Sequence, residues 1–117
     1  MSLPLSPEIL QACYDFLRAC PPFNKWNMPE GEDIKFKVVR NRSILGYYVL
    51  LNGRHVIAIS AACNGHTQTL IQTMAHEMIH LHQNHAGMET PAQHNRAFKK
   101  LGERVAKIHG FDPSAVF

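Results

Sequence analysis

The stretch TLIQTMAHEMIH, residues 69–80, decides how the chain is expected to fold. Asn64 or Thr67 is suited to cap a helix here, and Ala86-Gly87 is suited to end it after about Asn84. Apolar residues recur at the spacing of one helix face: Leu70, Ile71, Met74, Met78 and Leu81. The pattern predicts an amphipathic helix that buries one side.

The same helix carries an HExxH motif, residues 76–80. His76 and His80 are four residues apart, so both imidazoles project from one helix face and can bind a single metal ion. Glu77 points beside that metal and can reach a water held there without being a ligand. Because zinc lowers the pKa of such a water to about 7, Glu77 is the predicted general acid/base.

A catalytic zinc site needs a third protein ligand and an open position for water. The metzincin spacing would place glycine at 83 and histidine at 86, where this chain has Gln83 and Ala86. His85 misses the required position by one residue. The third ligand is therefore expected from a later segment.

A last helix is expected over residues 91–109, with Pro91 in its first turn and Gly110 just past its end. His94 opens this helix on its apolar side and is the best third ligand. Glu103 lies off that side, and Glu89 lies in the preceding loop, so both are weaker candidates. The expected apolar stripe consists of His94, Phe98, Leu101, Val105 and Ile108.

Eight histidines are an unusual number for 117 residues, and five of them lie between positions 76 and 94. His82 is two residues past His80, so it is expected to point to the far side of the helix into solvent. His85 is expected at the helix end, near the negative end of the dipole or at the mouth of the site. The remaining histidines are expected at the surface or as caps: His55, His66 and His109.

The rest of the chain predicts a further helix and a small sheet. Ser6 is expected to cap a first helix over residues 7–20, which Pro21-Pro22 ends before a loop over residues 22–33. Strands are expected at 34–39, 46–51 and 54–60, and Asn52-Gly53 is a strong hairpin signal. The expected fold class is α+β with a three-stranded antiparallel meander.

The bulk properties fit one globular domain over residues 1–117. No apolar run approaches the roughly 20 residues of a membrane helix, and no secretory signal is expected at the start. The three widely spaced cysteines, Cys13, Cys20 and Cys63, form neither a CxxC pair nor a disulfide framework. A cytoplasmic location is expected.

The chain resembles the SprT-like metallopeptidases, a family that includes the Spartan-type proteases, which act on DNA–protein crosslinks. The resemblance rests on TLIQTMAHEMIH and on the later segment QHNRAFKKL, where His94 and Phe98 match the third histidine and an aromatic four residues on. It covers about residues 7–109. Two departures are Asn95, where the family often has glycine, and the lack of a CxxC pair.

The resemblance implies a minimal zincin-like fold with a sheet whose last strand is an edge beside the site. It also implies a zinc-dependent metalloendopeptidase that cleaves proteins. A substrate chain would then pair with the edge, expected at residues 56–60. Tyr47, Tyr48, His66 and Arg96 are candidates for stabilising the oxyanion. The alternative function is that of a zinc-stabilised binding module without catalysis, and the presence of Glu77 argues against it. A third hypothesis is a helical scaffold that binds no metal.

A weak association with DNA is a further expectation, because basic residues gather on two predicted faces. A solvated surface explains the same residues, since no recognised nucleic-acid module accompanies them. The basic residues are Lys35, Lys37, Arg40 and Arg42 near the first strand, and Arg96, Lys99, Lys100, Arg104 and Lys107 on the last helix.

Overall fold

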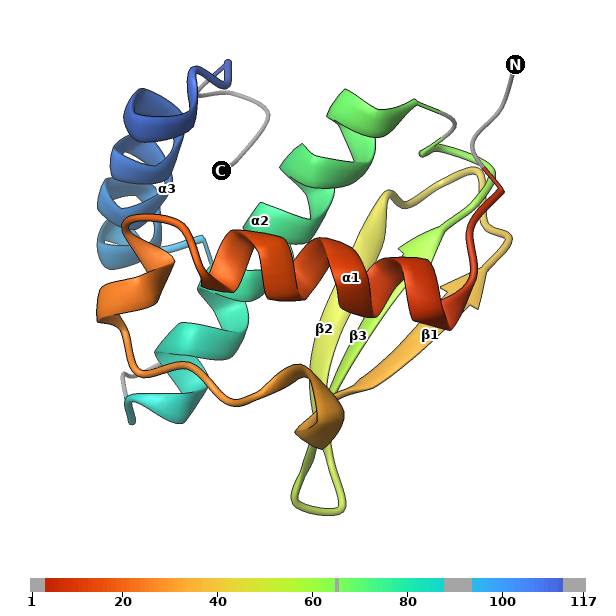
Figure 1. Cartoon of the computed structure of the whole chain (residues 1–117), viewed down its shortest axis with the longest axis horizontal. Helices are drawn as coiled ribbons and strands as arrows, with labels where there is room; N and C mark the ends of the chain where they lie inside the picture. Colours follow the sequence, from red (N-terminus) through yellow and green to blue (C-terminus); the bar gives the residue numbers. More distant parts are fainter. Residues whose placement is uncertain (1–3, 65, 88–93, 113–117) are drawn as a thin grey trace.

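A computed structural model of the chain describes residues 4–64, 66–87 and 94–112 (Figure 1). Helices and strands follow one another along the chain in the expected order. The elements are α1 (Pro7–Arg18), the 3₁₀ turns η1 (Phe23–Lys25) and η2 (Gly31–Asp33), β1 (Lys35–Val39), β2 (Gly46–Leu51), β3 (Arg54–Ser60), α2 (Thr67–His85) and α3 (Arg96–His109). The mixed α+β composition predicted from the sequence is confirmed.

The sheet is mixed, so the prediction of a purely antiparallel meander is wrong. The strand order is β1-β3-β2, with β2 antiparallel and β1 parallel to β3. The hairpin at Asn52 and Gly53, both with positive φ, fixes β3 beside β2 as expected. Nothing local to the sequence fixes the position of β1, which pairs with the other side of β3.

Strand β3 lies in the centre of the sheet, and most of it is buried on both faces. Residues 56–60 are all buried, a pattern typical of an interior strand rather than of an edge. The prediction that residues 56–60 form the edge beside the site is therefore wrong. The edges are β1 and β2, and β2 carries the exposed apolar residues Val49, Leu50 and Leu51.

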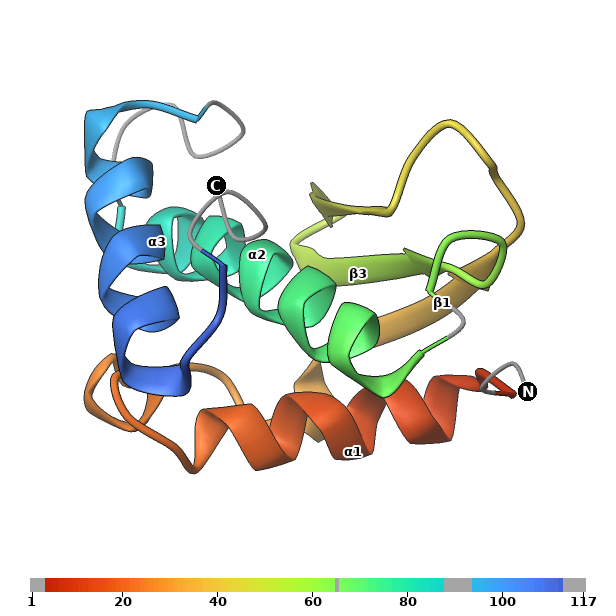
Figure 2. The same ribbon diagram turned by 90° about the horizontal axis from the view of Figure 1, so that it is seen from above.

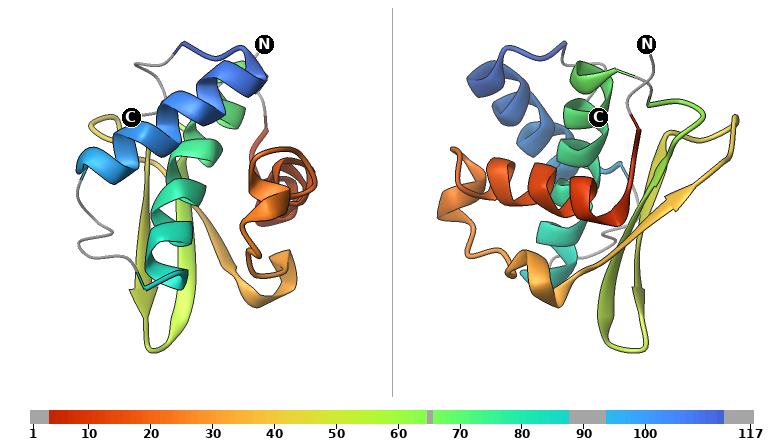
Figure 3. Two further views of the ribbon diagram at one scale, coloured as in Figure 1. Left: turned by 90° about the vertical axis from the view of Figure 1, so that its left-hand side faces the viewer. Right: turned by 45° about the vertical axis from the view of Figure 1, so that its right-hand side comes forward.

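Helix α2 lies in the middle of the molecule and packs against α1, α3, β2 and β3. Figures 2 and 3 show α1 and α2 on one side of the sheet, with α3 beyond α2. Gly46 allows β2 to approach closely, because a Cβ atom there would lie 2.5 Å from the carbonyl oxygen of Ala58 and 3.3 Å from Cγ2 of Thr73. The buried core joins these layers and includes Leu10, Tyr14, Phe36, Ile57, Ile59, Met74, Met78 and Phe98.

The beginnings of the helices match the prediction for α1 but not for α2. Ser6 caps α1 by accepting a hydrogen bond from the Ile9 amide at 3.2 Å. Neither Thr67 nor Asn64 caps α2, whose N-cap is His66 without a side-chain bond. The Asn64 amide is instead buried, where it donates to the carbonyl oxygens of Leu45 and Ser60 and accepts from the Thr73 hydroxyl at 2.7 Å.

Helix α3 begins at Arg96, so the prediction of a start at Pro91 and of His94 inside the helix is wrong. Asn95 is the N-cap, and its side-chain oxygen accepts from the Phe98 amide at 2.9 Å. Pro91 itself lies outside the described residues. Gly110, with φ of 73°, ends the helix as expected.

Within the described ranges, none of the helices is both long enough and apolar enough to span a membrane.

Candidate metal centre

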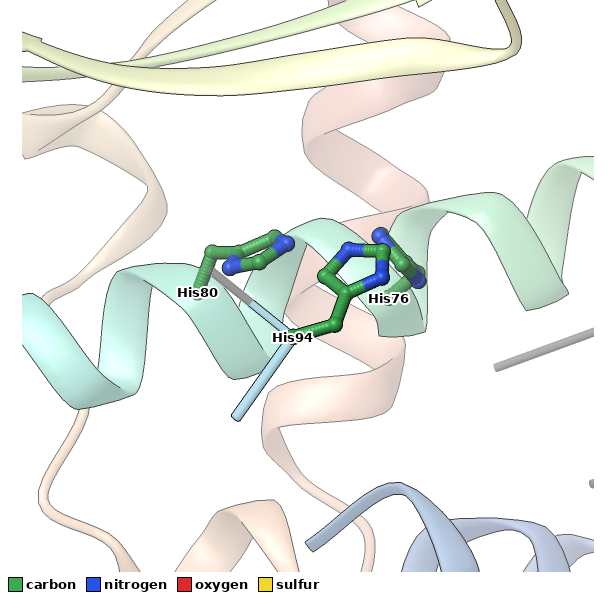
Figure 4. Close-up of side chains that lie close together, drawn as sticks. All are labelled: His76, His80 and His94. Atoms are coloured by element: carbon green, nitrogen blue, oxygen red, sulfur yellow. The ribbon is translucent and has the colours of Figure 1, made fainter. Parts of the chain in front are cut away.

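Three histidine rings from two segments converge beside the middle of α2 (Figure 4). The ring centroids of His76 and His80 lie 4.9 Å apart, as expected for side chains one helical turn apart. His94 precedes α3 and brings its ring to 4.8 Å from His76 and 5.1 Å from His80. One nitrogen from each ring lies within 4.8 Å of the others. The structure therefore brings together the three residues that the sequence singled out as ligands.

The cluster is closed on one side and open on the other. His80 is buried, His76 is half-buried, and His94 is exposed to solvent. The cluster is therefore accessible to solvent from the side of His94.

A single aromatic ring contacts all three histidines. Phe98 is fully buried, and its ring stacks on His94 at 4.6 Å and on His80 at 4.3 Å. It also meets His76 edge to face at 5.0 Å. Rotation of the imidazoles is therefore restricted by packing as well as by the backbone.

Glu77 lies next to His76 on α2 and is only 4% exposed. Burial raises the pKa of its carboxyl group to about 8 in the metal-free chain, because charge is disfavoured away from water. A carboxyl group that takes up and releases protons near neutral pH is suited to general acid/base work.

The remaining histidines do not join the cluster. His82 does point to the far side of α2, but its predicted solvation is wrong: the ring stacks on Trp26 at 4.2 Å and is half-buried. His85 is exposed near the end of α2 and meets His55 edge to face at 5.8 Å. His109 contacts the carbonyl oxygen of Pro21 at 2.6 Å.

The carboxylate alternatives for the third ligand gain no support. Glu103 is exposed on α3, and Glu89 lies outside the described residues. Among the residues that the structure describes, the three histidines form the one group of three or more metal-ligating side chains.

The four candidates for oxyanion stabilisation lie in different surroundings. Tyr48 Oη lies 2.6 Å from His55 Nδ1, and burial raises the pKa of this hydroxyl to about 12. Tyr47 is adjacent on the strand and so faces away from α2. His66 is the N-cap of α2 and lies roughly 15 Å along the helix axis from His76. Arg96 is exposed at the first position of α3, two residues after His94.

Three residues that contact α2 or the beginning of α3 were not predicted from the sequence. Gln83 is fully buried on α2, Asn95 caps α3 directly after His94, and Trp26 covers His82. Of these three, only Gln83 could have been found from the helical spacing, because it lies three residues after His80 and so shares the side of α2 that carries the metal ligands.

The donor set fits a zinc ion. Three imidazoles with an accessible fourth position are a known arrangement for catalytic zinc, whereas structural zinc sites have four protein ligands. His76, His80 and His94 would hold the ion, and Glu77 is next to them without belonging to the donor set.

A comparison with protein-family models identifies the family of the chain. The model of the SprT-like family matches residues 17–115, and the chain belongs to this family. No curated protein and no solved structure gives a significant match.

Proposed function

We propose that the protein is a zinc-dependent metalloendopeptidase that hydrolyses peptide bonds of protein substrates. The convergence of His76, His80 and His94 beside the buried Glu77 carries the proposal. Family membership supports it, because a metallopeptidase is what the resemblance to SprT-like proteins implies.

Zinc bound by the three histidines would supply a water of pKa about 7 and polarise the substrate carbonyl group. Glu77 accepts the proton of the attacking water on its carboxylate and later donates it to the nitrogen of the leaving amine. Its buried position keeps bulk water from competing for that proton. Arg96 is the candidate that places positive charge near the developing oxyanion.

The substrate chain would bind along β2, the exposed edge beside the site. Figure 4 shows this pale yellow strand passing the three histidine rings, and β2 packs against α2. The two-residue hairpin makes Leu51 and Arg54 a hydrogen-bonded pair, so alternate residues of β2 bond to β3. The main-chain groups of Tyr48 and Leu50 consequently point outward, where an added strand can pair with them.

The exposed side chains along this edge are apolar. Leu51 is 57% exposed, and Leu45, Val49 and Leu50 are also exposed. Pairing through the main chain gives little sequence selectivity, and these side chains favour a substrate segment that is extended and partly apolar.

A weak association with DNA is a secondary proposal. The basic residues of α3 are exposed, as are Lys35 and Lys37 on β1. Binding through these faces would depend steeply on salt concentration, because phosphate contacts release counterions. We also propose a cytoplasmic location, which the three free cysteines support.

Cleavage of an unstructured protein such as casein tests the proposed activity. The zinc-loaded parent is expected to cleave it, and Glu77→Gln is expected to retain zinc but lose cleavage. Glu103→Gln, on an exposed part of α3, is the matched control and should cleave like the parent. Equal cleavage by Glu77→Gln and the parent would contradict the proposal. Zinc binding without cleavage of casein or of DNA-bound proteins would favour the non-catalytic binding module.

A further inference from the structure

Gln83 is a fully buried polar side chain between α2 and the beginning of α3. Its Nε2 donates a hydrogen bond to Oδ1 of Asn95 at 3.4 Å. Its Oε1 is buried as well and finds no donor within the described part of the chain. Burying an amide oxygen without a donor is unfavourable, so packing alone does not explain a glutamine here.

Asn95 is tied to α3 in two further ways. Its Oδ1 accepts from the Phe98 amide at 2.9 Å, and its backbone carbonyl oxygen accepts from the Lys99 amide at 3.0 Å. Through Gln83 the same oxygen is tied to α2. One acceptor atom therefore joins the helix that carries His76 and His80 to the residue directly after His94.

The third histidine needs such a connection more than the other two. The α2 backbone sets the spacing of His76 and His80, whereas His94 is exposed and lies outside both helices. A metal ion recruits three ligands with less loss of conformational freedom when the third is already held near the other two. Phe98 completes the connection by stacking on both His94 and His80.

We propose that Gln83 is a positioning residue for the metal site: its bond to Asn95 holds His94 in register with α2 and thereby sets the affinity for zinc. This inference rests on the proposed zinc site. Gln83 itself is neither a ligand nor a catalytic residue.

Gln83→Met tests this role, because methionine has a similar volume and no polar atoms. The dissociation constant for zinc, measured by competition with a chromophoric chelator, is expected to rise about tenfold, at the lower end of outer-shell effects. The metal-free variant is expected to unfold at the same temperature as the parent or higher, because an unpaired buried oxygen has been removed. A role in folding alone predicts the opposite pattern, with lower stability and unchanged affinity.

Two further variants separate positioning from a general structural effect. In a His94→Ala background, Gln83→Met should leave the residual zinc affinity unchanged, since the residue acts through His94. Asn95→Ser keeps a cap oxygen for the Phe98 amide but is too short to hold Gln83 as well, so it should reproduce the loss of affinity.

The outcomes also separate this inference from the proposed function. Parent-like zinc affinity in Gln83→Met, or an equal loss in the His94→Ala background, would overturn the positioning role and leave the zinc peptidase intact. A parent that binds no zinc would overturn both. A parent that binds zinc without cleaving protein would leave the positioning role standing.

Discussion

The buried carboxyl group of Glu77 should make the metal-free protein less stable as the pH rises. In the folded chain the pKa of this group is raised from 4.5 to about 8 by burial. Between these two values the folded state holds a proton that the unfolded state releases, so the free energy of unfolding falls with increasing pH. Glu77→Gln removes the titrating group and keeps its shape.

The size of the effect follows from the two pKa values. Each unit of pH above 4.5 and below 8 is worth about 1.4 kcal/mol. Relative to the Glu77→Gln variant, which has no titrating group at this position, the parent should lose about 1 kcal/mol at pH 5 and about 3 kcal/mol at pH 7. Below pH 4 the difference between the two proteins should no longer change with pH.

Urea unfolding at several pH values, with a chelator present to remove metal, measures this difference. The single tryptophan, Trp26, stacks on His82 in the folded state and provides the fluorescence signal. All other ionisable groups are the same in both proteins, so their contribution to the difference largely cancels. Glu103→Gln is the control, because its side chain is exposed and should follow the parent at every pH. A stability difference between Glu77→Gln and the parent that stays constant from pH 5 to 7 would refute the reasoning.

Three further predictions concern the packing around Phe98, the close approach at Gly46 and the edge strand β2. Phe98→Ala should lower the free energy of unfolding by about 3–5 kcal/mol, since it leaves a cavity at a fully buried site. It should also weaken zinc binding, because the ring stacks on His94. Thermal denaturation measures the first effect and chelator competition the second, and an unchanged zinc affinity would argue against the stacking role. Gly46→Ala should destabilise by about 1–3 kcal/mol, because its Cβ meets the backbone oxygen of Ala58; parent-like urea unfolding would contradict the close approach of β2. Leu50→Pro removes an N–H group that points outward from the edge of β2, so it should raise KM for protein substrates with little loss of stability. Val49→Pro breaks a hydrogen bond to β3 and should instead destabilise the fold. If Leu50→Pro cleaves with the KM of Leu50→Ala, strand pairing at β2 is not the binding mode.

Features with a short-range cause could be predicted from the sequence. The Ser6 cap, the Asn52-Gly53 hairpin and the helix that carries His76 and His80 all depend on residues within a few positions of one another, and the structure shows them as expected. The apolar spacing of Phe98 and Val105 also predicted the side of α3 that is buried.

The features that were missed depend on long-range packing. Hairpin chemistry fixes β3 beside β2 but says nothing of β1, which lies on the other side of β3. The apolar run over residues 56–59 was a usable signal for a central strand, but only the strand order shows that β3 is central. The stacking of His82 on Trp26 joins residues more than fifty positions apart, for which helical periodicity gives no information.

The position of His94 shows both the reach and the limit of the sequence pattern. It was predicted as the third ligand because it opens the last helix on the apolar side, and the structure places it with His76 and His80. The helix, however, begins two residues later, since Asn95 accepts the Phe98 amide and so becomes the cap. His94 therefore depends on the cap and on Gln83 for its position.

Anomalous diffraction at the zinc edge from crystals of the zinc-loaded protein tests the central claim most directly. The account predicts one strong peak, about 2.1 Å from a ring nitrogen of each of His76, His80 and His94, with a fourth position open to water. A peak bound elsewhere, or a zinc held by His76 and His80 while His94 stays away, would contradict it.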